Sequence, residues 1–403
     1  MGPSLRNVVV VGASAAGLAA ADGLREAGFD GSVTILSAET IAPYDRPSLS
    51  KSLLASVDEP RLRQLRTADH LAAQRFDLRL GVEAAGLDID RRYVVTTDGE
   101  ALPYDALIIA TGTRSRTMWT VEGRPLPTLR TAADFAVLRQ AAASHSDVTL
   151  IGSGFIGLEL AAAFRSRRVD VTVFGRASVP LVDVLGREIA AALRTLHAER
   201  GAIVHCGRQA VEVSGEPGGY TVRTSDGYCH RTSYVIAGIG VDPETAWLAR
   251  SGVAVEDGVL CDADGRTSAP GVYAAGDVAR YADPTGGRRV RIEHWTNAVE
   301  QGRHAALNLA RGERRPFVRV PYFWTDQYDR KYHCYGHRSP RDHTRVVEGT
   351  LDSEFIALYG DGTHLHGVIA CGCLTSLAGY RRLLQRRASY AEAIEYTTIA
   401  ASL

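Results

Sequence analysis

Lysine is almost absent from this chain of 403 residues. Arginine and lysine together number 46, which equals the number of aspartates and glutamates, yet only Lys51 and Lys331 are lysines. Because lysine can give up its proton and arginine cannot, the place of each lysine in the fold matters for chemistry. The balanced charge gives the chain no overall positive field, so we expect neither a nucleic acid nor a membrane as a partner.

Long apolar runs and redox-type cysteine pairs are also missing. No apolar run reaches the roughly 18 residues that a transmembrane helix needs, and a strand precedes the first helix, so we expect a cytoplasmic protein. The six cysteines include no C-x-x-C pair, which argues against an enzyme that reduces disulfides through closely spaced thiols. We interpret the close pair Cys371 and Cys373 as buried thiols on one face of a strand.

The histidines predict no metal site. His333, Cys334 and His337 lie close together in the sequence, as do His364 and His366. Neither group offers four ligands at the spacing of a zinc site, so we interpret them as core or surface residues and expect no metal.

A glycine-rich turn is present near the start of the chain. Residues 7–17 read Asn-Val-Val-Val-Val-Gly-Ala-Ser-Ala-Ala-Gly. The valines predict a strand buried on both faces, and the glycine after them turns the chain into a helix whose exposed amides can hold a pyrophosphate. In the usual G-x-G-x-x-G motif of a dinucleotide site, the middle glycine stands where this chain has serine. An isolated match can also be a tight turn without a ligand. The expected contacts are Gly12, Ser14, Ala15, Ala16 and Gly17.

A second copy of the motif strengthens the first. Leu150–Glu159 carries all three glycines, and its expected nucleotide contacts are Gly152, Gly154, Phe155, Ile156 and Gly157. Two dinucleotide folds in one chain predict two dinucleotides. For the first fold we predict a strand Val8–Val11, a helix Ala15–Ala27 and a strand Ser32–Leu36. Glu39 follows, where a carboxylate can accept both ribose hydroxyls of an adenosine or can lie in solvent.

Residues 44–51 read Tyr-Asp-Arg-Pro-Ser-Leu-Ser-Lys. Pro47 fixes the loop, Arg46 offers a forked donor to phosphate, and Lys51 stands at the predicted start of a helix. This octet resembles the Tyr-Asp-Arg-Pro-Pro-Leu-Ser-Lys segment of the FAD-dependent ferredoxin reductases that serve oxygenases. Only Ser48 departs from that pattern. The apoptosis-inducing factor is a more distant relative of the same family.

Five later segments resemble the family's motifs in the same order. They are Leu107–Gly112, Leu129–Thr131, Gly271–Asp277, Arg291–Gly302 and Pro321–Gln327. The resemblance implies an α/β fold with two Rossmann-like dinucleotide-binding domains of the glutathione-reductase-like type, the second inserted in the first, plus a C-terminal α+β domain. The predicted boundaries are 1–112 and 242–320 for the FAD-binding domain, 113–241 for the NAD(P)H-binding domain and 321–403 for a C-terminal interface domain. In the last we predict strands Thr344–Thr350 and Glu354–Tyr359, an apolar run His366–Cys371 and a helix Ala378–Arg387.

The resemblance also implies the cofactors and the catalytic pair. FAD would take hydride from NADPH or NADH, with Lys51 near the flavin N5 and Glu159 near the nicotinamide carboxamide. An ion pair between them would orient both rings and stabilise negative charge on the reduced flavin; the alternative is a surface pair worth at most about 1 kcal/mol. The other cofactor contacts expected are Val82, Thr111, Gly112, Arg130, Gly240, Gly276, Asp277, His294, Trp295 and Trp324.

One departure from the family bears on the choice of nucleotide. Relatives that use NADH end the strand after the second glycine helix in a glutamate, whereas this chain has Gly175 there, followed by Arg176. Losing a carboxylate and gaining a guanidinium favours a 2′-phosphate, and so NADPH or a relaxed choice. The alternative is that Arg176 points to solvent and NADH still binds weakly.

The electron acceptor implied by the family is a [2Fe-2S] or similar small ferredoxin, which in turn serves a cytochrome P450 or a Rieske oxygenase. Two arginine groups could attract such an acidic partner or could be solvated surface: Arg381, Arg382, Arg386 and Arg387, and Arg311, Arg314 and Arg315. Two alternatives stay open, namely a reductase of oxygen, quinones or another small acceptor, and a redox-sensing flavoprotein resembling the apoptosis-inducing factor.

Overall fold

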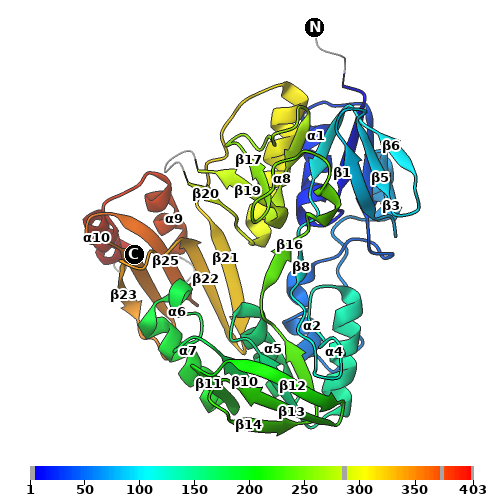
Figure 1. Cartoon of the computed structure of the whole chain (residues 1–403). Helices are drawn as coiled ribbons and strands as arrows, with labels where there is room; N and C mark the ends of the chain where they lie inside the picture. The colour runs from blue at the N-terminus through cyan, green and yellow to red at the C-terminus, as the bar shows by residue number, and fades with distance from the viewer. Residues whose placement is uncertain (1–4, 284–287, 373–375, 401–403) are drawn as a thin grey trace. The chain divides into compact units, whose positions relative to one another are not determined.

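The computed structural model describes residues 5–283, 288–372 and 376–400. The chain forms two compact units, and Figure 1 colours it from end to end. The first unit contains Met1–Asp45, Leu62–Arg114 and Val241–Arg319, and the second contains Arg46–Arg61, Ser115–Gly240 and Val320–Leu403. The segment that carries Lys51 therefore packs with the second unit, although the sequence suggested the FAD-binding domain for it. The three-domain boundaries stay a prediction.

A parallel five-stranded sheet forms the centre of the first unit, in the order β18-β7-β1-β2-β3 (Figure 1). Its strands are β1 (Asn7–Val11), β2 (Ser32–Ser37), β3 (Phe76–Leu80), β7 (Ala106–Ile109) and β18 (Val272–Ala274). With α1 at Ala15–Glu26, the predicted strand, helix and strand are confirmed. Because β18 follows the inserted fold and pairs with β7, the chain returns to the sheet that it left.

The valines of β1 join two hydrophobic cores. Val8 and Val10 pack with α1 and with α8 (Trp295–Arg311) on one face of the sheet, while Val9 and Val11 belong to the core on the other face. The strand is thus buried on both faces, as the uninterrupted run of valines predicts.

Smaller elements complete the first unit. They are the sheet of β4 (Ala84–Asp88), β5 (Tyr93–Thr96) and β6 (Ala101–Pro103), the sheet of β17 (Val259–Cys261), β19 (Ala279–Ala282) and β20 (Arg289–Val290), the helix α3 (Ala68–Ala73) and the short helices η2 (Ala246–Leu248) and η3 (Gly276–Val278). The paired strands β8 (Thr113–Ser115) and β16 (Val241–Pro243) are the places where the chain leaves the first unit and returns to it.

A second parallel sheet, in the order β11-β10-β9-β15, carries the second glycine motif. Its strands are β9 (Asp147–Ile151), β10 (Asp170–Gly175), β11 (Ala202–Cys206) and β15 (Val235–Ala237), and its neighbouring helices are α4 (Ala132–Ser144), α5 (Phe155–Ser166), α6 (Val182–Leu185) and α7 (Arg187–Glu199). An antiparallel sheet of β12 (Ala210–Glu216), β13 (Gly219–Thr224) and β14 (Cys229–Thr232) packs its apolar side chains against β9, β10 and β15. The octet contains η1 (Arg46–Ser48) and ends at Lys51, the N-cap of α2 (Ser52–Ala55).

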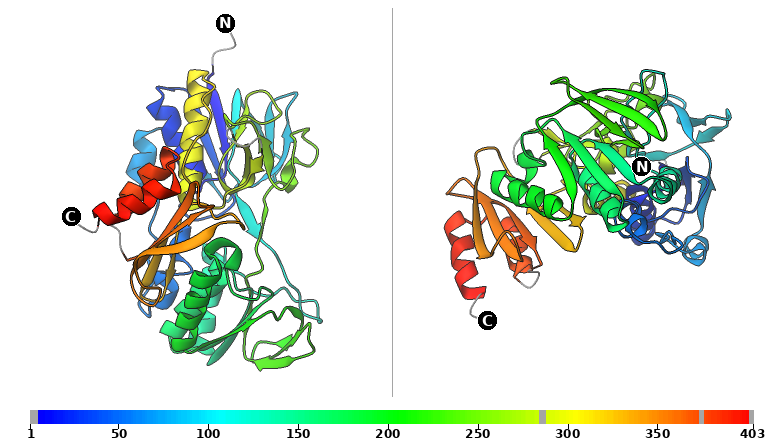
Figure 2. Two further views of the ribbon diagram at one scale, coloured as in Figure 1. Left: turned by 90° about the vertical axis from the view of Figure 1, so that its left-hand side faces the viewer. Right: turned by 90° about the horizontal axis from the view of Figure 1, so that it is seen from below.

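The C-terminal part of the second unit is an antiparallel sheet in the order β21-β22-β25-β24-β23. Its strands are β21 (Tyr322–Gln327), β22 (Arg330–Gly336), β23 (His343–Gly349), β24 (Phe355–Gly360) and β25 (Leu365–Cys371). Helices α9 (Leu377–Gln385) and α10 (Tyr390–Ala400) pack on one face (Figure 2), and α6 and α7 pack on the other. The predicted strands and arginine-rich helix are confirmed. Cys371 is buried at the end of β25, and Cys373 lies outside the described residues. Among the described helices, none is both long and apolar enough to cross a membrane.

Candidate functional site

The turn between β1 and α1 has the backbone geometry of a pyrophosphate site. Gly12 has a φ of +110°, and a Cβ there would lie 2.2 Å from the Ala110 carbonyl oxygen. A Cβ on Gly17 would lie 1.8 Å from the oxygen of Gly12, so only glycine lets α1 start this close to the strand. Ser14 stands at the N-cap without a capping bond from its side chain, and no acidic residue occupies the first turn. The helix therefore presents its positive end to an anion, which fits the diphosphate of FAD.

A carboxylate is held beside this turn. Glu39 follows the carboxyl end of β2, and its Oε2 accepts a hydrogen bond of 2.7 Å from the hydroxyl of the buried Tyr44. Val82 lies close by, since its amide donates to the Ser37 carbonyl at 2.8 Å. Glu39 is thus placed at the sheet edge where an adenosine ribose is expected.

The other cofactor contacts predicted for the first unit gather at the same sheet edge. Thr111 and Gly112 follow β7, and Gly276 and Asp277 follow β18, so both pairs lie beyond the carboxyl ends of strands that share a sheet with β1. Parallel sheets bind nucleotides at that edge. His294 and Trp295 open the long helix α8, whose N-cap is His294.

The turn from β18 into η3 is fixed by Gln301 of α8. The Gln301 side chain accepts the Gly276 amide at 3.0 Å. Burial lowers the pKa of His294 to about 4 against the opposing charge of Asp277, so His294 is neutral at pH 7.

The second glycine turn repeats the close packing of the first with one difference. A Cβ on Gly152 would lie 2.1 Å from the Gly238 oxygen, and a Cβ on Gly157 would lie 2.0 Å from the oxygen of Gly152. At Gly154 a Cβ would meet no atom within 4 Å, so this middle glycine faces open space. Phe155 and Ile156 form the first turn of α5 beside it.

Replacing Gly157 or Gly154 by alanine should affect stability and nucleotide binding differently. We expect Gly157→Ala to lower the free energy of unfolding by about 1–3 kcal/mol, because the new methyl group has no room against the backbone. Gly154→Ala should leave unfolding nearly unchanged and weaken only nucleotide binding. Guanidinium unfolding and calorimetric titration with NADPH measure the two effects. Equal loss of stability in both variants would contradict the steric argument.

Lys51 and Glu159 form the predicted ion pair, and the pair is buried. The Lys51 Nζ lies 2.7 Å from Glu159 Oε2, and the two side chains are only 12% and 3% exposed. The geometry therefore contradicts the alternative of a solvent-exposed surface pair. Lys51 is placed by the N-cap of α2, and Glu159 by the glycine turn that begins α5.

Two hydroxyl groups that the sequence analysis did not single out complete this cluster. Ser50 Oγ donates to Glu159 Oε2 at 2.5 Å, and Thr325 Oγ1 donates to Oε1 at 2.7 Å. Three donors from two chain segments, Ser50 and Lys51 in one and Thr325 in the other, thus hold one buried carboxylate. They fix its orientation and keep its charge solvated by the protein. Both hydroxyls lie inside motifs of the family resemblance, in the octet and in residues 321–327, and that was the available signal.

The hydrogen bonds continue from Thr325 into the C-terminal sheet. Gln327 donates to Thr325 Oγ1 at 2.9 Å, and its carbonyl oxygen lies 3.0 Å from Nε2 of the fully buried His197. The Tyr328 hydroxyl lies 3.1 Å from the other ring nitrogen. Burial lowers the pKa of His197 to about 4, while the bond to Gln327 opposes the shift.

This buried histidine predicts a pH-dependent stability. The unfolded chain binds a proton at His197 near pH 6.5 and the folded chain only near pH 4. The free energy of unfolding should therefore be unaffected above pH 6.5 and fall as the pH is lowered through that window, by about 3 kcal/mol for this residue. Guanidinium unfolding from pH 7 to pH 4 tests this, with His197→Gln as the comparison. The variant should start less stable and show a flatter slope; parallel slopes would contradict the prediction.

The loop at the end of β10 contains a steric coupling that the sequence did not reveal. Gly175 is buried, and a Cβ there would lie 2.1 Å from the Oγ and 2.7 Å from the Cβ of Ser153. Arg176 is exposed directly after it. Ser153 in the glycine turn thus fills the space that a side chain at position 175 needs.

The remaining predicted contacts of the second unit lie in turns and element ends. Arg46 and Pro47 form η1, and the Arg130 amide donates to Asp134 at the start of α4 at 2.9 Å. Gly240 has a φ of +101°, and Trp324 lies in β21. Trp324 stacks beside Tyr322 at 6.1 Å, with the Lys331 ammonium 6.0 Å from its ring.

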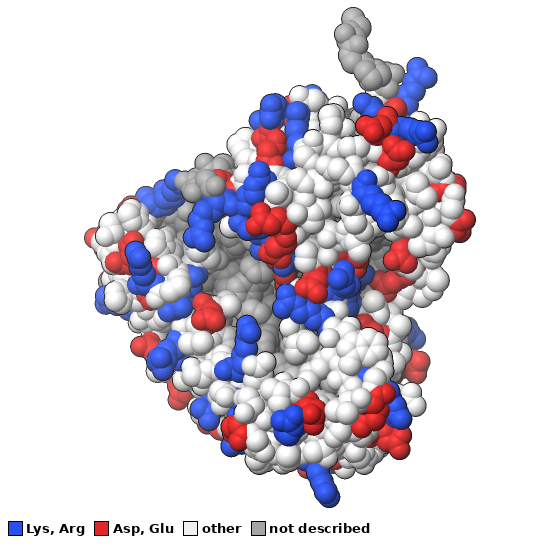
Figure 3. Space-filling model, in the orientation of Figure 1, with Lys and Arg blue, Asp and Glu red and all other residues white. Residues whose placement is uncertain are grey.

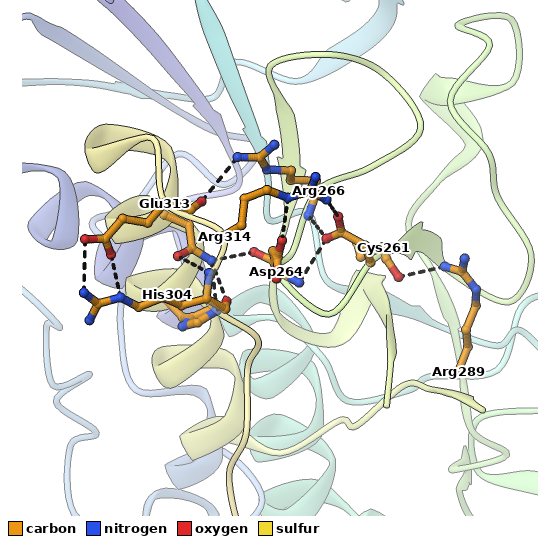
Figure 4. A network of polar contacts seen from close by, with 10 residues as sticks. Cys261, Asp264, Arg266, Arg289, His304, Glu313 and Arg314 are labelled. Atoms are coloured by element: carbon orange, nitrogen blue, oxygen red, sulfur yellow. Dashed lines mark hydrogen bonds and ion pairs between the residues drawn. The ribbon is translucent and has the colours of Figure 1, made fainter. Parts of the chain in front are cut away.

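The two arginine groups differ in how far acids neutralise them. Arg314 pairs with Asp262 and Asp264 within the network of Figure 4, and Arg315 pairs with Glu313. On the face that Figure 3 presents, positive and negative side chains are interspersed. On α9, Arg381 lies over the Tyr335 ring at 5.7 Å and Arg382 is exposed, while Arg386 after the helix pairs with Glu392 at 2.7 Å. Arg381 and Arg382 are therefore the better candidates for attracting an acidic partner.

Comparison with known proteins gives the following matches. A family model described as pyridine nucleotide-disulphide oxidoreductase matches residues 6–302, and one described as reductase C-terminal matches residues 322–396. The chain is 35% identical to rhodocoxin reductase of Rhodococcus erythropolis, covering 90% of this chain and 85% of the relative. It is 36% identical to the anthranilate 1,2-dioxygenase system ferredoxin–NAD(+) reductase component of Burkholderia cepacia, covering 80% and 79%. The crystal structure of the covalent putidaredoxin reductase–putidaredoxin complex matches with a TM-score of 0.88 at 30% identity, covering 98% and 99%.

Proposed function

The chain belongs to the pyridine nucleotide-disulphide oxidoreductases, and among them to the ferredoxin reductases of oxygenase systems, and from this we propose that it carries electrons from NADPH through FAD to a ferredoxin. FAD, when bound, accepts a hydride and releases the two electrons one at a time. The observation that carries the proposal is the buried Lys51–Glu159 pair, held by Ser50 and Thr325 in a chain with two nucleotide turns.

Each part of the proposed site has a distinct task. The N-termini of α1 and α5 hold the two pyrophosphates, and Glu39 accepts the hydroxyls of the FAD ribose. Lys51 and Glu159 orient the two reacting rings, with Lys51 as donor toward the flavin and Glu159 as acceptor for the nicotinamide amide. Because both are buried and bonded, they need no reorganisation when the nucleotide arrives.

The choice of NADPH rests on the end of β10. No carboxylate stands at Gly175, and Arg176 is exposed beside it, where its guanidinium can pair with a 2′-phosphate. The Burkholderia relative is named for NAD(+). The proposed preference for NADPH is therefore a difference between this chain and that relative.

The proposed partner is a small acidic ferredoxin that serves a cytochrome P450 or a Rieske oxygenase. Support comes from the relatives, one of which is a component of a dioxygenase system and another of which was crystallised with putidaredoxin. Arg381 and Arg382 on α9 would attract such a partner and make its association depend on salt. A cytosolic site of action is part of the proposal, in keeping with free cysteines such as Cys206 and Cys229.

Anaerobic stopped-flow reduction of the FAD holoenzyme by NADPH and NADH, followed by mixing with oxidised ferredoxin, tests both half-reactions. We expect faster reduction by NADPH and a ferredoxin step that slows as salt rises. Fast reduction without transfer to any of several ferredoxins would favour a small acceptor such as a quinone. Failure of both nucleotides to reduce the flavin would favour a redox sensor.

A further inference from the structure

The turn between β24 and β25 brings together two imidazoles and a carboxylate. Asp361 Oδ1 accepts the backbone amides of Thr363 and His364, each at 2.8 Å, and this fixes the carboxylate within the turn. Its second oxygen lies 3.8 Å from Nδ1 of His364 and 3.9 Å from Nε2 of His366. The two rings are nearly parallel, at 6° and 6.4 Å between centroids, as expected two residues apart on one side of an extended chain.

His366 is oriented from behind by a second carboxylate. Its Nδ1 lies 2.7 Å from Oδ1 of Asp342, whose side chain is fully buried. The other oxygen of Asp342 accepts the Ser339 amide at 2.7 Å, so the Asp342 side chain is fixed as well. An ionised carboxylate at Nδ1 makes that nitrogen the donor, which leaves the lone pair of Nε2 facing Asp361. Proteins orient metal-binding histidines with such outer carboxylates.

We propose that Asp361, His364 and His366 bind a divalent transition-metal ion of the zinc type. One ligand atom from each of the three lies within 4.8 Å of the others, and no other group of this kind occurs in the part of the chain that the structure describes. Imidazole and carboxylate are suitable ligands for Zn²⁺, Ni²⁺ and Cu²⁺. Bonds of about 2.0–2.2 Å in tetrahedral geometry need ligand atoms about 3.3 Å apart. The two distances from Asp361, 3.8 and 3.9 Å, therefore have to shorten by about 0.5 Å, and a separation of 4.8 Å by about 1.5 Å.

The surroundings of the three ligands suit a metal ion with an open coordination position. His364 is exposed and His366 partly exposed, so water can complete the coordination. Because the amides of Thr363 and His364 hold Oδ1 of Asp361, its Oδ2 is left on the side of the two imidazoles. The histidines alone predicted no metal site. Asp361 adds a third ligand to them, and Asp342 orients His366.

Titration of ZnCl₂ into the FAD holoenzyme by calorimetry tests the site, together with zinc X-ray absorption of the loaded protein. We expect one equivalent of roughly micromolar affinity and a shell of nitrogen and oxygen only. His366→Gln and Asp361→Asn, which keeps an Oδ1 acceptor for the turn, should each weaken binding at least about 10-fold. Asp342→Asn should weaken it about 10- to 100-fold without touching the ion.

The matched control is His343→Gln, which changes an exposed histidine outside the group. It should leave the affinity unchanged, and the melting temperature with and without Zn²⁺ shows whether each variant is folded. Sulfur in the zinc shell would assign the ion to cysteines and overturn the proposal. The same follows if the ligand variants bind Zn²⁺ as well as the unaltered chain, or if that chain binds none at millimolar Zn²⁺.

Discussion

Replacing Glu159 by glutamine should slow flavin reduction by NADPH by about 100-fold. The amide keeps the volume of the side chain, but only one of its two ends can accept a hydrogen bond. It therefore cannot accept from Lys51 and Ser50 at one end and from Thr325 at the other, so the group that orients the nicotinamide changes its orientation. Losing one preorganised polar group of this kind costs about 10²–10³ in rate. Anaerobic stopped-flow at saturating NADPH measures the effect on the chemical step apart from binding.

The same substitution leaves a buried ammonium without its counter-charge, so the free energy of unfolding should also fall by about 3–5 kcal/mol. The double variant Lys51→Met with Glu159→Gln separates the two effects, because it removes both charges together and should recover most of the stability but none of the rate. Lys331→Met, at the other lysine, is the control; it is half exposed and should change neither quantity. Recovery of the rate in the double variant would contradict the orienting role.

Installing glutamate at position 175 should change the nucleotide preference only when Ser153 is replaced as well. With Ser153→Gly and Gly175→Glu together, the ratio of kcat/KM for NADPH over NADH should fall by about 100-fold, since the new carboxylate repels a 2′-phosphate and accepts the ribose hydroxyls. Gly175→Glu alone should cost about 1–3 kcal/mol of stability, because its Cβ meets the Ser153 side chain at 2.1 Å.

Steady-state kinetics with both nucleotides and melting temperatures for the single and double variants check this coupling. Ser153→Gly alone is the control, and it should leave the ratio of kcat/KM for NADPH over NADH largely unchanged. A single Gly175→Glu variant that is as stable as the parent and as selective for NADH as the double variant would remove Ser153 from the account.

Local sequence patterns predicted much of the fold, because the burial of a strand and the tightness of a turn depend on residues that are close together in the sequence. The valines before Gly12 are buried on both sides. The first and last glycines of both motifs stand where a Cβ would meet a backbone oxygen. The strands and helix of the C-terminal domain also appear where alternation and apolar runs put them. The pairing of Lys51 with Glu159 came from the family resemblance, and the structure adds that the pair is buried.

What the sequence left out depends on contacts between distant segments. Thr325 reaches Glu159 across many residues, and a hydroxyl inside a strand carries no mark of that partner. The conflict between Ser153 and a side chain at 175 arises only when two loop ends meet. In the same way, Asp342 becomes a partner of His366 only when the sheet has formed.

The three donors to Glu159 also become available one after another during synthesis. Ser50 and Lys51 leave the ribosome early, the carboxylate follows, and Thr325 emerges only when four-fifths of the chain has been made. A nascent chain can therefore form both glycine turns while Glu159 still lacks the third of its donors, Thr325. The hydrogen bonds that orient Glu159 are therefore complete only after β21 of the C-terminal sheet has been made.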